Sequence, residues 1–226
     1  TRDAQRFYVT WDDEALRLHW SGANWDGDGD LFVYLDTKPG GAADAYDPYG
    51  TGVSDVIHLP ASGDDAMAAD YAIWVASADV AYLLAWDGSG WVQQATLDDT
   101  YLLVAGSLRP ALTDLRIPFG ALGITNPAAN PLKLVAFASE EGVLRPWAVM
   151  PERNPLRGPA LDGGGSAISL AQSYAWPGLA AGICPNGGTA PEVGLRFGQV
   201  DTDASATVVR YLADGLIGPD GRLDAG

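Results

Sequence analysis

The sequence predicts an all-β protein: a two-sheet antiparallel β-sandwich of the jelly-roll or immunoglobulin-like kind. Three observations lead to this prediction. Apolar residues alternate with polar ones or gather in short runs, as they do in strands. Turn signals separate these runs, and almost no segment shows a helical period. Asp also outnumbers Glu by 24 to 5, and Asp favours turns over helix interiors.

The first strands are marked by alternation and by the turns between them. Residues 7–11 are followed by an acidic turn and then by residues 16–20, where every second side chain is apolar. After a loop of Asp and Gly, residues 31–35 are apolar at every position. That pattern is expected of a central strand that is buried on both faces.

The later strands follow the same logic. Residues 87–90 (Asp-Gly-Ser-Gly) form a tight turn that leads into Trp91 and Val92, which indicates a hairpin. Residues 119–123 are the only expected helical turn. The remaining strands are predicted at residues 71–76, 81–86, 101–105, 115–118, 132–138 and 147–150.

We expect residues 1–160 to form the sandwich and residues 161–226 to form a Gly/Pro-rich extension. Residues 194–200 and 206–212 are further strand candidates, which either pack back on the sandwich or begin another module. Cys184 is the only cysteine, so an internal disulfide is excluded. The opening residues carry no signal peptide, and we expect the chain to be a piece of a longer protein.

The charge balance limits the partners. The formal net charge is −16, with 29 acidic residues against 13 basic ones. Nucleic acids and anionic membranes need Lys and Arg to neutralise their phosphates, so neither is an expected partner. Membrane insertion is not expected either, because no apolar run reaches the roughly 18 residues of a spanning helix.

The loop Asn24–Asp30 predicts a calcium site. Its carboxylates stand at every second position, and the intervening glycines let the backbone curl so that the oxygens converge. An EF-hand is excluded, because Leu35 occupies the twelfth position and strands replace the helices. The alternative is a solvated acidic turn without an ion. The candidate ligands are Asp26, Asp28, Asp30 and, from the far end of the next strand, Asp36.

Three segments resemble the family 9 carbohydrate-binding modules and related DOMON-type sandwiches. Residues 8–18 (YVTWDDEALRL) and 29–37 (GDLFVYLDT) are similar to the opening of that family. Residues 113–123 (TDLRIPFGALG) are similar to its late Ile-Pro element, so the resemblance spans roughly residues 7–150. It implies an extracytoplasmic sandwich with structural calcium, often appended to glycoside hydrolases or surface proteins. It also implies a sugar slot between aromatic rings, although no residue here is assigned to that slot.

The aromatic residues are the second candidate feature, with eight Trp and nine Tyr. Sugars stack their C–H faces on aromatic rings while polar groups bind the hydroxyls. Trp20, Trp74 and Trp86 lie within strands and are expected to pack in the sheets. Rings near loops or strand ends are the candidate ligand-binding residues, namely Trp25, Trp91, Trp147, Tyr46 and Tyr49.

Catalysis has little support, because no Ser-His-Asp order and no Gly-x-Ser-x-Gly elbow is present. Some DOMON relatives bind haem, an alternative kept open only by His19, His58, Met67 and Met150. We therefore predict a non-catalytic, calcium-stabilised carbohydrate-binding module, secreted or on the cell surface. Its partners would be a polysaccharide or cell-surface glycan and other modules of the parent chain. The alternative is a structural or adhesive spacer domain without a small ligand.

Overall fold

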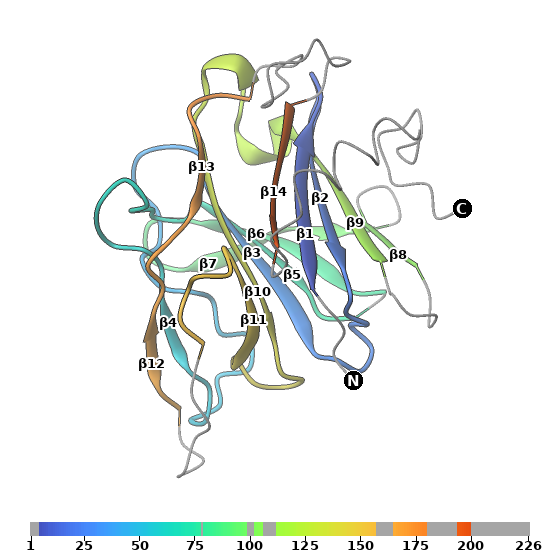
Figure 1. The fold of residues 1–226 in the computed structure, drawn as a ribbon, viewed down its shortest axis with the longest axis vertical. Helices are drawn as coiled ribbons and strands as arrows, with labels where there is room; N and C mark the ends of the chain where they lie inside the picture. The colour runs from blue at the N-terminus through green and yellow to red at the C-terminus, as the bar shows by residue number, and fades with distance from the viewer. Residues whose placement is uncertain are drawn as a thin grey trace. The chain divides into compact units, whose positions relative to one another are not determined.

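The computed structural model forms two compact units, each built around one antiparallel sheet (Figure 1). The first unit comprises Thr1–Asn24, Asp98–Asn130 and Pro177–Gly226, and the second comprises Trp25–Leu97 and Pro131–Trp176. Residues 102–105 and 194–199 are described as backbone only. The structure describes residues 5–77, 79–98, 102–105, 112–156, 165–179 and 194–199.

The sheet of the first unit has five strands in the order β14-β1-β2-β9-β8, and all its neighbours are antiparallel (Figure 1). Alternation gives it one apolar and one polar face. Phe7 and Trp20 face each other on the apolar side, whereas Arg17 and His19 lie on the other. Its strands are β1 (Arg6–Trp11), β2 (Ala15–Ser21), β8 (Leu102–Ala105), β9 (Leu112–Pro118) and β14 (Gly194–Gln199).

Two short 3-10 helices follow β9, η1 (Phe119–Leu122) and η2 (Pro127–Ala129). The first confirms the expected helical turn, and it ends at Gly123, which adopts a left-handed conformation (φ 65°). Among the described residues, no helix has the length and apolar character needed to cross a membrane.

The main sheet of the second unit has the order β11-β10-β3-β5-β6-β7, with β13 also paired to β10. A separate parallel pair joins β4 (Val56–His58) to β12 (Ala167–Ser169). The strands of the main sheet are β3 (Asp30–Asp36), β5 (Tyr71–Val75), β6 (Ala81–Trp86), β7 (Trp91–Leu97), β10 (Leu132–Ser139), β11 (Pro146–Met150) and β13 (Tyr174–Trp176).

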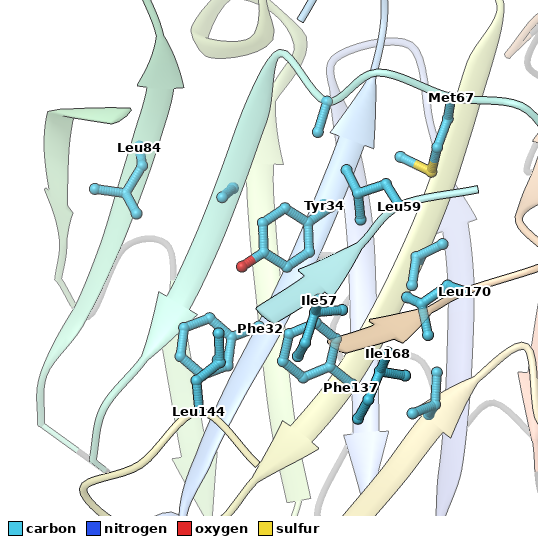
Figure 2. Packing of buried hydrophobic residues seen from close by; sticks show 14 residues of the cluster. Phe32, Tyr34, Ile57, Leu59, Met67, Leu84, Phe137, Leu144, Ile168 and Leu170 are labelled. Carbon is cyan, nitrogen blue, oxygen red and sulfur yellow. The ribbon is translucent and has the colours of Figure 1, made fainter. Parts of the chain in front are cut away.

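A hydrophobic cluster covers one face of this main sheet. Phe32 and Tyr34 of β3 and Phe137 of β10 project from that face, and their rings stack at centroid distances of 5.3 to 5.6 Å. Figure 2 shows β4 and β12 lying over these rings, with Ile57 and Ile168 directed at them. The alternate residues of β3, such as Val33, are also fully buried. Burial on both faces explains why this strand is apolar throughout.

The all-β prediction with antiparallel sheets is confirmed, and every strand expected up to residue 150 is present. Three short strands were not predicted: β4, β12 and β13. Strands β12, β13 and β14, which follow residue 160, pair with β4, β10 and β1. The strand expected at residues 206–212 lies outside the described residues.

Candidate ligand-binding face

The structure does not bring the four candidate metal ligands together. Asp26 is exposed and Asp28 half-buried on the loop, whereas Asp30 is fully buried. Asp36 stands at the other end of β3, six residues from Asp30 and hence roughly 20 Å away. Its carboxylate accepts a hydrogen bond from the Ala68 backbone N–H (3.1 Å). Asp30 and Asp36 therefore cannot share an ion.

Within the described ranges, no group of three or more His, Cys, Asp or Glu side chains is placed to hold a metal ion. The four aspartates as a set thus do not fit one calcium ion, which takes six to eight oxygens converging on one point.

Asp30 instead points into an aromatic cluster. Its Oδ2 accepts hydrogen bonds from the Tyr49 hydroxyl and from the Trp74 indole Nε1 (2.6 Å). Burial raises the pKa of Asp30, the two hydrogen bonds lower it in part, and nearby Glu141 raises it. Burial also raises the pKa of the Tyr49 hydroxyl, and its hydrogen bond to Asp30 raises it further. Tyr49 therefore remains a protonated donor at neutral pH.

Trp74 lies at the centre of this aromatic cluster. The Tyr46 and Tyr49 rings meet its indole nearly edge-on, at centroid distances of 6.1 and 6.3 Å. The Tyr82 ring lies 5.3 Å away, because Trp74 and Tyr82 are direct neighbours across β5 and β6. All four rings are half-buried, so each keeps some surface in contact with solvent. Phe32 lies parallel to Trp74 on its buried side.

A second group of rings lies at the β6–β7 turn. Trp86 and Trp91 face each other across the hairpin, with centroids 5.6 Å apart, and both are half-buried. Trp91 also meets the buried ring of Tyr34 edge-on at 5.9 Å. Trp91 therefore packs against the same hydrophobic cluster as the rings around Trp74.

Hydrogen bonds hold the loop that carries Tyr46 and Tyr49. The buried Tyr34 hydroxyl accepts from the Tyr46 backbone N–H (3.0 Å) and donates to the Tyr46 carbonyl (3.4 Å). Three residues on, the Tyr49 hydroxyl is bound to Asp30. Because Tyr34 and Asp30 both belong to β3, a rigid strand positions the two loop rings.

The five aromatic residues singled out from the sequence have different environments. Tyr46, Tyr49 and Trp91 are half-buried and pack against the hydrophobic cluster of the main sheet. Part of each ring therefore stays available to a ligand. Trp25 is fully buried, so its ring has no exposed face for a ligand. Trp147 is half-buried beside the acidic loop, where its Nε1 donates to the carbonyls of Asp28 (3.0 Å) and Ser139 (2.9 Å).

Sequence reasoning missed three rings of this face. Trp74 and Trp86 were expected to be packing residues, and Tyr82 was not considered, yet all three are half-buried. A usable signal was present, because Tyr82 and Trp86 are four residues apart in one strand and must share a face. Nothing in the local sequence places Trp74 beside Tyr46, which is 28 positions away.

The arrangement offers ring surfaces and hydrogen-bonding groups, which suits a polar ligand with C–H faces. The His58 Nδ1 lies 2.6 Å from Asp44 Oδ1, but both side chains are largely exposed. Such a pair in open solvent lacks the dry surroundings that activate catalytic groups. No family model matches the chain, and comparison with curated proteins likewise finds no match.

Proposed function

We propose that the chain is a non-catalytic carbohydrate-binding module that holds a polysaccharide or a cell-surface glycan on the half-buried rings of its second unit. The observation that supports this most is the arrangement around Trp74. Tyr46, Tyr49 and Tyr82 pack against the Trp74 indole, and all four rings retain exposed surface. Pyranose rings stack on such surfaces, and rings alone bind without catalysing.

Preorganisation supports the same proposal. Ordering loose side chains on binding costs roughly 0.5–1.5 kcal/mol for each one. Here Tyr34 and Asp30 hold the loop rings before any ligand arrives. A weakly interacting ligand such as a sugar gains from this, because little affinity is lost to ordering.

The setting we propose is extracytoplasmic, either secreted or on the cell surface, with the module joined to others in a longer chain. An accessory role beside a glycoside hydrolase fits a binding surface without catalytic groups. The strongly acidic charge supports the exclusion of nucleic acid as a partner.

Affinity electrophoresis tests the proposal. The full chain is run in native gels that contain hydroxyethylcellulose, xylan, galactomannan or mixed-linkage β-glucan, and we expect retardation in at least one of them. Tyr46→Ala removes a ring but keeps the backbone contacts to Tyr34, so it should reduce the retardation. The matched control is Val56→Ala, an exposed β4 residue that is no part of the ring cluster.

The spacer alternative makes the opposite forecast. If the wild type runs unretarded in every gel and is not captured on a glycan array, the structural or adhesive reading replaces the carbohydrate proposal. Equal retardation of the wild type and Tyr46→Ala would show that the aromatic cluster around Trp74 does not bind the polysaccharide.

Calcium remains a separate proposal, limited to the loop Asn24–Asp30 with Asp26 and Asp28 as side-chain ligands. An ion that binds only the folded state raises its melting temperature. We therefore expect EDTA to lower the melting temperature and Ca²⁺ to restore it. The double variant Asp26→Asn/Asp28→Asn should lose this response, whereas Asp36→Asn, at the far end of β3, should keep it. An unchanged melting temperature in EDTA would contradict the calcium proposal.

A further inference from the structure

The β6–β7 hairpin presents a strip of rings and polar side chains on one face. Tyr82, Leu84 and Trp86 lie on the same side of β6, since side chains alternate along a strand. On β7, Trp91 is opposite Trp86 and Gln93 is opposite Leu84. We call this face of the hairpin the β6–β7 strip.

Rings stand at both ends of the β6–β7 strip. At the turn end, Trp86 and Trp91 form a half-buried pair whose ring planes meet at 66°. At the other end, the half-buried Tyr82 ring leans on Trp74, with 37° between the planes. Each end therefore offers aromatic surface to a ligand that lies along the hairpin.

Polar groups lie between the two ring pairs. Gln93 and Thr96 are exposed, and the Gln93 Nε2 donates to the Thr96 hydroxyl (3.1 Å). Leu84, the cross-strand neighbour of Gln93, is buried in the hydrophobic cluster, so the surface between the ring pairs is polar. Amide and hydroxyl groups between stacking rings are what a chain of sugars needs, because its hydroxyls alternate with C–H faces.

The strip is longer than a single sugar. Tyr82 and Trp86 are four residues apart in one strand, which corresponds to roughly 13 Å between their Cα atoms. That distance is well beyond the width of one pyranose ring. One sugar unit therefore cannot stack on both ring pairs at once.

Charge and position restrict the ligand further. Residues 81–98 contain no Lys or Arg, and their charged residues are Asp87 and Asp98. A polyanionic glycan would meet only repulsion there. β7 is the terminal strand in the described order of the sheet, and the Asp87–Ser89 turn is exposed. At this edge no further described strand of the sheet limits the length of a ligand.

We infer that the β6–β7 strip binds an internal stretch of a neutral, linear polysaccharide, with separate sugar units stacked at Trp86/Trp91 and at Tyr82/Trp74. This inference rests on the proposed carbohydrate function and names the ligand class of that same site. Binding grows with chain length until both ring pairs are occupied, and it does not depend on a chain end.

Calorimetric titration of the full chain tests chain length and end dependence. The probes are oligosaccharides of two to six units, cut from whichever of the four polysaccharides retards the protein. The hexasaccharide should bind about tenfold tighter than the disaccharide, because it adds a second stacking contact, and tenfold corresponds to about 1.4 kcal/mol. A borohydride-reduced hexasaccharide, whose terminal ring is opened, should bind as tightly as the untreated one.

Variants test the residues of the strip. Trp86→Ala should weaken hexasaccharide binding by about tenfold. Gln93→Ala, an exposed position that tolerates truncation, should weaken it several-fold. Val92→Ala, exposed on the opposite side of the same strand, is the matched control and should bind as the wild type does.

Different results contradict the inference about the β6–β7 strip and the proposed carbohydrate-binding function. Equal affinity for the disaccharide and the hexasaccharide, or loss of binding on reduction, overturns the inference and leaves a carbohydrate-binding protein with another kind of site. Wild-type affinity in both Trp86→Ala and Gln93→Ala also overturns it. Failure to bind any of the polysaccharides overturns the proposed function itself, and the inference with it.

Discussion

Replacing Gly29 by alanine should destabilise the second unit strongly. Gly29 has φ +107°, a conformation that L-residues rarely adopt. A Cβ built there would lie 1.8 Å from the carbonyl oxygen of Ser139 and 2.9 Å from its carbonyl carbon. Ser139 cannot easily retreat, because it is paired with Asp30 in the β3–β10 ladder.

The magnitude follows from two terms. A non-glycine residue in such a conformation costs about 1–3 kcal/mol. Moving the Ser139 carbonyl also breaks its hydrogen bond from the Trp147 indole (2.9 Å), a loss of about 1 kcal/mol. Gly29→Ala should therefore cost about 2–4 kcal/mol, out of a stability of about 5–15 kcal/mol.

Urea unfolding followed by tryptophan fluorescence measures this cost. With an m-value of roughly 3 kcal/mol per M, the Gly29→Ala midpoint should fall by about 0.7–1.3 M. Gly27→Ala is the matched control, because its Cβ would meet nothing within 4 Å. That control should stay within about 0.5 kcal/mol of the wild type. If the two variants unfold at the same midpoint, the close approach of Gly29 to Ser139 does not limit the side chain at position 29.

Three further substitutions have clear expected outcomes. Burial lowers the pKa of His19 from 6.5 to about 3. Below pH 6.5 the unfolded chain therefore binds more protons than the folded one. The free energy of unfolding should fall by up to about 1.4 kcal/mol for each pH unit as the pH is lowered from 6.5 to 3. His19→Leu should flatten that part of the stability curve, and an unchanged slope would refute the assignment. Tyr34→Phe removes the hydroxyl that is hydrogen-bonded to the Tyr46 backbone. It should lower the free energy of unfolding by about 1 kcal/mol in urea melts and weaken sugar binding in calorimetry. The buried Asp70 carboxylate accepts a hydrogen bond from the Thr37 backbone N–H (2.8 Å), so Asp70→Ala should cost about 1–3 kcal/mol in a urea melt. Full stability of that variant would contradict the role of Asp70.

Strand positions could be predicted from the sequence because their signal is local. Alternation over residues 16–20 reports a strand with one buried face, and β2 occupies Ala15–Ser21. Turn chemistry at residues 87–90 sets the β6–β7 hairpin, whose register then aligns Trp86 with Trp91. These patterns need no knowledge of distant residues.

Short strands stabilised by remote partners could not be predicted. β4 and β12 have three residues each and are more than 100 positions apart, and neither carries a periodic pattern of its own. Their pairing depends on Ile57 and Ile168 covering the rings of β3 and β10 (Figure 2). That burial exists only once the main sheet is built.

The residues of the candidate site could likewise be predicted only in part from the sequence. Tyr46, Tyr49 and Trp91 could be selected as loop-borne rings, but Trp25 lies at a loop as well and is fully buried. Asp30 belongs to a loop that resembles an ion site, yet its carboxylate accepts hydrogen bonds from two aromatic side chains.

The sequence by itself determined the all-β class, the strand order along the chain, the acidic loop and the supply of aromatic residues, because each depends on neighbours within a few positions. Only the tertiary structure decided which rings share a face and where Asp30 points. Those outcomes depend on pairings such as Trp74 with Tyr82 and Tyr34 with Tyr46. Sheet register and loop anchoring create these contacts, and both arise from residues far apart in the sequence.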